Sequence, residues 1–343
     1  MTFTLVVDDF LIKSGDRAAV EHLFAAIRKE YRLEVDWSAS KYIGMTIKYN
    51  KKERWLQHSM PGYVEAALVR FGVERSSKPT HNATKFDPIL YGQRIQLAEA
   101  DDSPLCTDAE AKFIREVVGV FLYYARAIDI TMATPLSKLS IGQAKPTTRT
   151  LAAVMYFLQY AATYPDATLT YYPSDMRLVI WSDASYLSES NARSRAGGLH
   201  YLSSHGDPTA ASPNGAVEAI SAIIPTVVSA ASEAEAAALF LNGQAGVPSR
   251  LTLADLGYPQ SATPIISDNT TAIGFANNSV RLKRSKAIDM RYHWIRDRVE
   301  RGEYSVAWGP GADNFADYFT KNHPAKHCRE VRSRYVGDKV AAS

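Results

Sequence analysis

"LVIWSDASYLSESNARSRAGGLHYLSS", residues 178–204 of this 343-residue chain, places an acidic residue at the end of an apolar run. Its first four residues, Leu178 to Trp181, are apolar and typical of a short buried strand, which then runs into Asp183. A carboxylate at the end of a buried strand is unfavourable unless a partner compensates its charge. That partner is a backbone amide at a turn, a basic side chain or a metal ion, and this stretch alone leaves the three open.

The composition indicates a globular protein built around apolar cores. Hydrophobic residues make up 46% of the chain and charged residues 22%, which argues against overall disorder. The length predicts two or three compact units. The net charge of +3 permits a nucleic-acid partner without arguing for one.

Cysteine usage and hydropathy predict an intracellular chain. Cys106 and Cys328 lie far apart in the sequence, and two thiols make neither a disulfide framework nor a four-cysteine metal site. No apolar run approaches the roughly 18 residues needed to span a bilayer, and the first ten residues lack the basic start of a signal peptide. We therefore expect a cytosolic or nuclear location and no membrane partner.

The first half of the chain predicts hairpins and helices. We expect a hairpin with Asp8 and Asp9 at its tip, a helix over 16–31, two strands within 41–59, a helix over 61–72, a polar linker over 73–110 and long helices over 109–127 and 146–163.

The second half of the chain differs, because strands come in series and then alternate with helices. We expect strands over 167–172, 177–182, 196–203, 216–223, 263–267 and 304–309, and helices over 229–242, 270–277, 286–301 and from 313. This order predicts a mixed-sheet α/β fold rather than a regular βαβ repeat.

Acidic residues recur at strand ends and on helices of the second half. Asp183 and Asp268 each end a strand, Glu233 and Glu235 lie on an alanine-rich helix, and Asp317 lies early in the last predicted helix. Carboxylates gathered at one sheet edge are what two divalent cations require, and such a pair clamps the attacking water and the leaving oxygen of a phosphodiester. The two glutamates are about 200° apart around a helix, so only one can face such a site.

Each acid taken alone also has a structural interpretation. Asp183 could be a turn residue, Asp268 could cap the helix that follows it, and Asp317 could interact with a helix dipole. Glu235 could lie on a solvated helix face. Only their joint occurrence favours catalysis.

Basic residues near these acids are candidates for nucleic-acid binding. They are Arg193, Arg195, Lys283, Arg284 and Lys286. Their density suits contacts with a phosphate backbone. Without a nucleic-acid partner, the basic residues of 283–286 could equally form a solvated charged face, and Arg193 and Arg195 could balance the charge of the nearby acids.

Short motifs also follow one another along the chain in a recognisable order. WSDASY, RSRAGGLHYL, ASEAEAAAL, ISDNTTAIGFANN, RSKAIDMRYHWIRDRV and NFADYFTKNHP resemble the ribonuclease H domain of copia-type LTR retrotransposon Pol polyproteins. Upstream, LVVDDFLI, KYIGMTI, SMPGYVEAALVRFG and VVGVFLYYARAIDITMA resemble the end of the reverse transcriptase palm, its primer-grip hairpin, the thumb and the connecting segment. The resemblance covers nearly the whole chain.

The resemblance implies a ribonuclease H-like α/β fold, with a mixed five-stranded sheet and flanking helices. It divides the chain into a partial palm with the primer-grip hairpin (1–55), thumb and linker (56–110), helical connection (111–174), ribonuclease H domain (175–325) and basic C-terminal tail (326–343). The implied activity is hydrolysis of the RNA strand of an RNA/DNA hybrid, which its 2′-hydroxyl distinguishes from DNA.

The resemblance also implies the site. Asp183, Glu235, Asp268 and Asp317 match the metal-binding acids of the family, which hold two Mg²⁺ ions, with Mn²⁺ as a substitute. Glu235 is chosen over Glu233 because it fits the family pattern of Glu, two residues, then Ala-Leu. A metal ion thereby becomes the expected partner of Asp183.

Asp8 and Asp9 match the acid pair of the reverse transcriptase hairpin, in which the two acids would help to hold the metal ions for nucleotide addition, and a polar hairpin tip is the alternative interpretation. The tyrosine that precedes this motif in the family is absent, since the sequence here is Val6-Val7-Asp8-Asp9. A further catalytic aspartate and the fingers lie upstream in the family. We therefore expect no polymerase activity from this chain alone, the upstream part of Pol as a partner, and a location in cytoplasmic virus-like particles and the nucleus.

Two other functions remain open. The chain could be a non-catalytic nucleic-acid-binding relic of a truncated retroelement, or another nuclease or resolvase of the same fold, because a fold does not determine a substrate. Metal-dependent cleavage separates the enzyme from the relic, and substrate choice separates the nucleases.

Overall fold

The computed structural model describes residues 1–86, 101–204, 214–278 and 290–338. The helices are α1 (Arg17–Ile27), α2 (Tyr63–Arg70), α3 (Asp108–Ala127), α4 (Ala133–Gly142), α5 (Thr148–Thr163), α6 (Ala231–Asp255), α7 (Thr270–Ala276), α8 (His293–Glu300) and α9 (Ala325–Val331). The strands are β1 (Thr2–Val6), β2 (Asp9–Lys13), β3 (Lys41–Tyr42), β4 (Met45–Asn50), β5 (Trp55–Ser59), β6 (Ala167–Tyr171), β7 (Arg177–Glu189), β8 (Arg193–Ser203), β9 (Ala216–Ile223), β10 (Thr263–Ser267), β11 (Tyr304–Trp308) and β12 (Gly337–Asp338). Within these ranges no helix is both long and apolar enough to cross a membrane.

The larger unit is built on a five-stranded sheet in the order β11-β10-β7-β8-β9. β10 is parallel to both β7 and β11, whereas β7, β8 and β9 pair antiparallel in succession. The sheet is therefore mixed, which confirms the predicted fold class. β9 and β10 also begin and end at the predicted residues.

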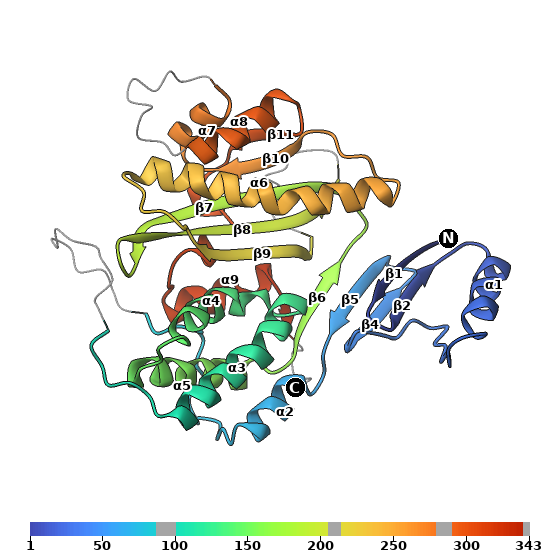
Figure 1. Cartoon of the computed structure of the whole chain (residues 1–343), viewed down its shortest axis with the longest axis horizontal. Helices are drawn as coiled ribbons and strands as arrows, with labels where there is room; N and C mark the ends of the chain where they lie inside the picture. The colour runs from blue at the N-terminus through green and yellow to red at the C-terminus, as the bar shows by residue number, and fades with distance from the viewer. Residues whose placement is uncertain (87–100, 205–213, 279–289, 339–343) are drawn as a thin grey trace.

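The side chains of β7 alternate between two cores. Leu178 and Ile180 belong to one core with residues of α6, α7 and α8, while Val179 and Trp181 belong to a second core with residues of α3, α4 and α5. Successive side chains of a strand point to opposite faces, so β7 is buried on both. Figure 1 shows the result, with α6 on one side of the sheet and the bundle of α3, α4, α5 and α9 on the other.

A second five-stranded sheet joins distant parts of the chain. Its order is β12-β6-β5-β4-β3, and every neighbouring pair is antiparallel. Two strands are predicted within 41–59, and the structure has three there, β3, β4 and β5. β6 pairs with β5 instead of joining the mixed sheet, and β12 then adds to its other edge.

The C-terminal segment is not the basic tail predicted over 326–343, because its described residues fold onto the bundle. Arg332 is 3% exposed, and its guanidinium donates a hydrogen bond of 2.8 Å to the Asp129 carboxylate, which is fully buried. It also donates to the hydroxyls of Thr131 and Tyr160, both at 2.6 Å. One of the basic residues that suggested a tail, Arg332, is therefore buried in an ion pair. Charged side chains are almost never fully buried without such a partner.

Two predicted helix boundaries are also wrong. α6 continues past Gly243 to Asp255, since the glycine permits close packing: a Cβ at Gly243 would lie 2.9 Å from Ile295. The helix expected from residue 313 is replaced by short 3₁₀ turns at Gly311–Asp313 and Asp317–Phe319. Tertiary contacts override local propensity in both places.

The N-terminal hairpin has the predicted form. β1 and β2 pair antiparallel, with Val6 opposite Asp9, so that Asp8 and Asp9 lie at the tip. Asp16 caps α1, because its carboxylate accepts hydrogen bonds from the amides of Ala18 and Ala19. All five side chains of β1 are exposed.

Candidate active site

Asp183 and Asp268 lie at the same level of two neighbouring parallel strands. Trp181 of β7 is in register with Ile266 of β10, and each acid follows two residues later. The carboxyl end of β10 therefore brings Asp268 beside Asp183. On its other side β7 pairs Asp183 with Gly197 of β8.

Glu235 reaches the same edge from the first turns of α6. Its Oε1 accepts a hydrogen bond of 3.3 Å from the amide of Ala184, the residue after Asp183. Glu233 is turned elsewhere, since its Oε2 accepts hydrogen bonds from the amide and hydroxyl of Ser229, at 2.6 and 2.8 Å. The two glutamates point apart as the helical spacing predicts.

The three carboxylates form a compact cluster, called here the acid triad (Asp183, Glu235 and Asp268). One oxygen from each lies within 4.8 Å of the others. Asp183 is 3% exposed and Glu235 is 7% exposed, whereas Asp268 is open to solvent. Oε2 of Glu235 is buried and accepts no hydrogen bond from the described residues.

The electrostatics of the acid triad favour a bound cation. Burial, together with the charges of Asp183 and Asp268, raises the pKa of Glu235 to about 9. Burial also raises the pKa of Asp183 to about 6, although Lys321 and Thr320 act in the opposite direction. Carboxylate oxygens are the ligands that Mg²⁺ and Mn²⁺ prefer, and a divalent ion would satisfy the unpartnered oxygen of Glu235. The residues present therefore fit a metal site.

Asp317 lies beside the acid triad but is linked to it through a lysine. Its carboxylate pairs with the Lys321 ammonium, which is also 3.8 Å from Oδ2 of Asp183. Nε2 of His323 lies 3.6 Å from the same Asp317 carboxylate. The structure thus brings three of the four predicted acids together and places the fourth next to them.

Asp268 is not the cap of α7. Asn269 takes that role, because its side chain accepts a hydrogen bond of 3.0 Å from the Ala272 amide. Gly311 leaves room for the Asp268 carboxylate, since a Cβ at that position would lie 2.6 Å from Oδ2. The capping interpretation is therefore wrong, and Asp268 is available to a ligand.

Thr320 and Lys321 are contacts of the site that the sequence analysis did not single out. Thr320, which is far from Asp183 in the sequence, donates a hydrogen bond of 2.5 Å to Oδ2 of Asp183 on β7. Both residues belong to the NFADYFTKNHP motif. They follow Asp317 by three and four residues. In a helix this spacing places side chains on one face, so it could have indicated that both lie near Asp317.

Comparison with known sequences identifies the relatives of the chain. No protein-family model matches it. The "Retrovirus-related Pol polyprotein from transposon TNT 1-94" of Nicotiana tabacum is 25% identical over 338 residues, which are 95% of this chain. The corresponding polyprotein from transposon RE2 of Arabidopsis thaliana is 26% identical over 324 residues, or 92% of the chain. The resemblance to copia-type Pol polyproteins is confirmed.

The chain spans 24% and 20% of the length of those two polyproteins. Solved structures similar to it include ribonuclease H1 from Halobacterium salinarum, at 16% identity and a TM-score of 0.29, covering 42% of this chain and 94% of that one. LC11-RNase H1, isolated from compost, is 15% identical with a TM-score of 0.31, covering 42% and 93%.

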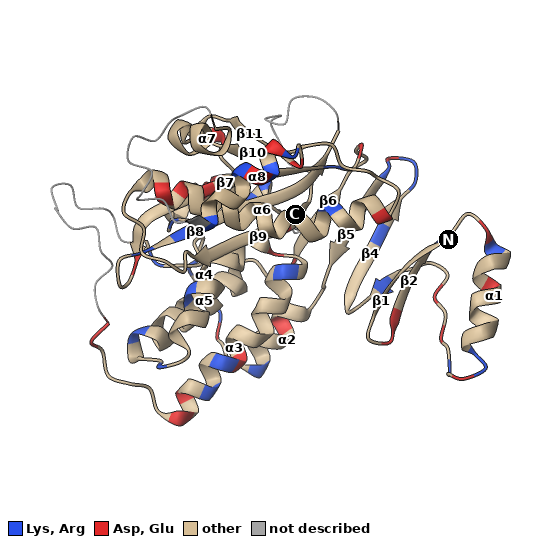
Figure 2. Ribbon diagram, turned by 45° about the horizontal axis from the view of Figure 1, so that its top comes forward, with Lys and Arg blue, Asp and Glu red and all other residues tan. Residues whose placement is uncertain are grey.

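The basic residues predicted to bind nucleic acid differ in burial and in their partners. Arg195 is fully buried, and its Nε donates a hydrogen bond of 2.6 Å to Glu189, so the prediction for Arg195 is wrong. Arg193 is partly exposed and donates to the Pro225 carbonyl. Lys283, Arg284 and Lys286 lie outside the described residues. Figure 2 shows acidic and basic residues interspersed along α3, so the charges of this helix do not favour phosphate binding.

Asp8 and Asp9 are not brought to the acid triad. They are exposed at the tip of the β1–β2 hairpin. Among the described residues, the acid triad is the one group of carboxylates close enough together to hold a metal ion.

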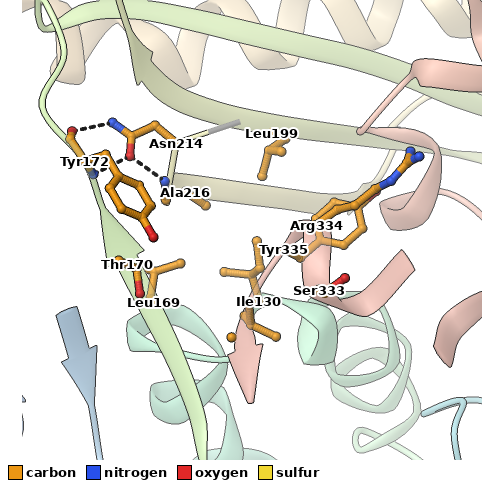
Figure 3. A pocket seen from close by; sticks show the side chains of 13 residues that line it. Ile130, Leu169, Thr170, Tyr172, Leu199, Asn214, Ala216, Ser333, Arg334 and Tyr335 are labelled. Carbon is orange, nitrogen blue, oxygen red and sulfur yellow. Dashed lines mark hydrogen bonds between the residues drawn. The ribbon is translucent and has the colours of Figure 1, made fainter. Parts of the chain in front are cut away.

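A cavity of about 250 Å³ also lies away from the acids, between β6 and the C-terminal segment (Figure 3). Thr170, Tyr172 and Arg334 are among its lining residues, and none of the four acids is.

Proposed function

We propose that this chain is a metal-dependent nuclease of the ribonuclease H type that hydrolyses the RNA strand of RNA/DNA hybrids. The observation that carries the proposal is the acid triad, in which three carboxylates from β7, α6 and the end of β10 converge. The relation to retrotransposon Pol polyproteins supports it, because reverse transcription produces such hybrids.

The acid triad would hold one divalent ion, and Asp317 is proposed to serve a second beside Asp183. Ions of this kind lower the pKa of a water and offset the charge that develops on the leaving oxygen. The protein's own part is to place the carboxylates before substrate arrives. Thr320 holds one oxygen of Asp183, and the Ala184 amide holds one oxygen of Glu235. Pre-organised groups of this kind need no rearrangement during the reaction.

The partners of the reaction are also proposals. Arg193 and the basic residues Lys283, Arg284 and Lys286 are proposed to contact the nucleic-acid backbone. The upstream regions of a Pol polyprotein are the proposed protein partner, and cytoplasmic virus-like particles and the nucleus the proposed locations.

Cleavage of defined substrates tests the proposal. The purified chain is incubated with end-labelled RNA/DNA hybrid, duplex DNA, duplex RNA and branched DNA, in Mg²⁺, in Mn²⁺ and in chelator. We expect cuts in the RNA strand of the hybrid alone, and their loss in chelator and in Asp183→Asn. Cleavage of duplex or branched DNA would indicate another nuclease on this fold. Binding of the hybrid without cleavage by a folded chain would indicate a non-catalytic protein.

A further inference from the structure

Residues Asp317–Asn322, called here the acid-bearing segment, carry three side chains of the candidate site: Asp317, Thr320 and Lys321. The segment has little regular structure of its own, because it contains only one short 3₁₀ turn. It lies directly on β8, where a Cβ at Gly197 would be 2.6 Å from Cγ2 of Thr320. Its position is therefore set by the residues that it packs against.

Two serines of the mixed sheet hold the backbone of this segment. Ser185 lies two residues beyond Asp183, on the same face of β7, and donates a hydrogen bond of 2.9 Å to the Thr320 carbonyl. Ser221 of β9 donates one of 2.7 Å to the Phe319 carbonyl. From the bundle, Nζ of Lys138 on α4 donates one of 2.7 Å to the side chain of Asn322.

Arg195 of β8 contacts both Ser221 of the sheet and α4 of the bundle. Its guanidinium donates hydrogen bonds of 3.0 Å to Oγ of Ser221, 2.8 Å to Oγ of Ser137 and 2.6 Å to Glu189. A hydroxyl has a single proton. Because Arg195 donates to Ser221, the proton of Ser221 is left to point at the Phe319 carbonyl.

We propose that Arg195 is a positioning residue, which acts through Ser221 and α4 to set the place of the acid-bearing segment, and so of Asp317, relative to the acid triad. The inference rests on the proposed function and replaces the nucleic-acid contact predicted for Arg195. The planar fork of an arginine serves three acceptors in fixed directions, which a lysine ammonium does not.

The test compares variants of this network in the full chain. Ser221→Ala and Ser137→Ala each remove one link, and Arg195→Lys removes the fork while keeping the charge. Ser140→Ala is the matched control, because that hydroxyl donates to the Leu136 carbonyl of its own helix. Thermal unfolding first establishes the folded fraction of each variant.

Kinetics on the labelled hybrid give the first readout. We expect kcat to fall about tenfold in Ser221→Ala and about a hundredfold in Arg195→Lys, with KM and its salt dependence unchanged, since small displacements of reacting groups cost rates of this size. Ser140→Ala should equal the wild type. A raised KM with a weaker salt dependence and an unchanged kcat would instead identify a phosphate contact, and kcat unchanged per folded molecule would identify a structural role; either result overturns the proposal.

Mn²⁺ binding to the substrate-free protein gives the second readout, independent of activity. Electron paramagnetic resonance titrations should show weaker binding of Mn²⁺ in Ser221→Ala and Arg195→Lys, matching the loss in Asp317→Asn. Identical binding curves for these variants and the wild type would overturn the positioning role. If the wild type fails to cleave the hybrid, the proposed function fails, while this titration still decides the role of Arg195.

Discussion

Glu235 of α6 accepts a hydrogen bond of 3.3 Å from the amide of Ala184, one residue beyond Asp183. This contact ties α6 to the middle strand of the mixed sheet at the point where Asp268 arrives from β10. Two of the three clustered carboxylates are buried there, where a negative charge is poorly solvated. In the absence of metal, the stability of the protein should therefore depend on pH, and metal binding should stabilise the fold.

The contribution of Glu235 to stability should depend on pH in the absence of metal. The pKa of its carboxyl is raised from 4.5 to about 9 in the folded protein. Between these values the folded state holds a proton that the unfolded state has lost, so the contribution is fully present below about pH 4.5 and is lost as the pH rises through 9. Relative to Glu235→Gln, the free energy of unfolding of the wild type in chelator should thus fall from pH 5 to 9, by about 1 to 3 kcal/mol at pH 8.

Chemical denaturation at a series of pH values measures this difference. Glu233→Gln is the matched control on the same helix, since a glutamine oxygen can still accept the bonds from Ser229. Saturating Mg²⁺ should stabilise the wild type more than Glu235→Gln, since a ligand stabilises the state that binds it. Parallel pH profiles of wild type and Glu235→Gln would contradict the description of the buried acid.

Gly311→Ala should weaken metal binding without unfolding the protein. The added Cβ would lie 2.6 Å from Oδ2 of Asp268, so the exposed carboxylate must move away. We expect about a tenfold loss of Mn²⁺ affinity by calorimetry, the equivalent of one displaced ligand contact. Gly119→Ala is the control, because nothing lies within 4 Å of a Cβ at that exposed position of α3. It should gain about 0.5 to 1 kcal/mol of stability and bind metal normally. Unchanged affinity in Gly311→Ala would exclude Asp268 as a ligand.

The ion pair of Arg332 and Asp129 should be essential to the fold. Arg332→Met leaves a fully buried carboxylate without its guanidinium, and we expect urea denaturation to show a loss of about 3 to 5 kcal/mol. Adding Asp129→Asn to Arg332→Met should restore part of that loss. Arg32→Met removes the exposed pair with Glu34 and should cost less than about 0.5 kcal/mol. A loss of similar size in both single variants would mean that the C-terminal segment is not anchored in this way.

The parts of the fold that are encoded locally could be predicted from the sequence. The bounds of β9 and β10 follow from apolar or alternating runs between polar turn residues. α3 begins directly after Thr107, its N-cap, which forms a capping box with Glu110. The angular spacing of a helix also indicated that only one of Glu233 and Glu235 can face the site, whereas the choice of Glu235 came from the family resemblance.

Long-range pairing could not be predicted in the same way. Nothing in the sequence near Arg195 or Arg332 distinguishes a buried arginine from a surface one, because their carboxylate partners are chosen by the tertiary fold. The pairing of β6 with β5 joins residues more than a hundred positions apart in the sequence. α6 passes through Gly243 and Pro248, which are usual helix terminators, because its packing against the sheet and α8 outweighs their local cost.

The acid triad is proposed to be a metal-dependent phosphodiesterase site. Its most direct test is cleavage of the labelled RNA strand of a hybrid in Mg²⁺ by the wild type, Glu235→Gln and Glu233→Gln, each shown to be folded. We predict that the wild type and Glu233→Gln cleave at similar rates and that Glu235→Gln is at least about a hundredfold slower. Cleavage by Glu235→Gln at the wild-type rate, or metal-independent cleavage by the wild type, would contradict the claim.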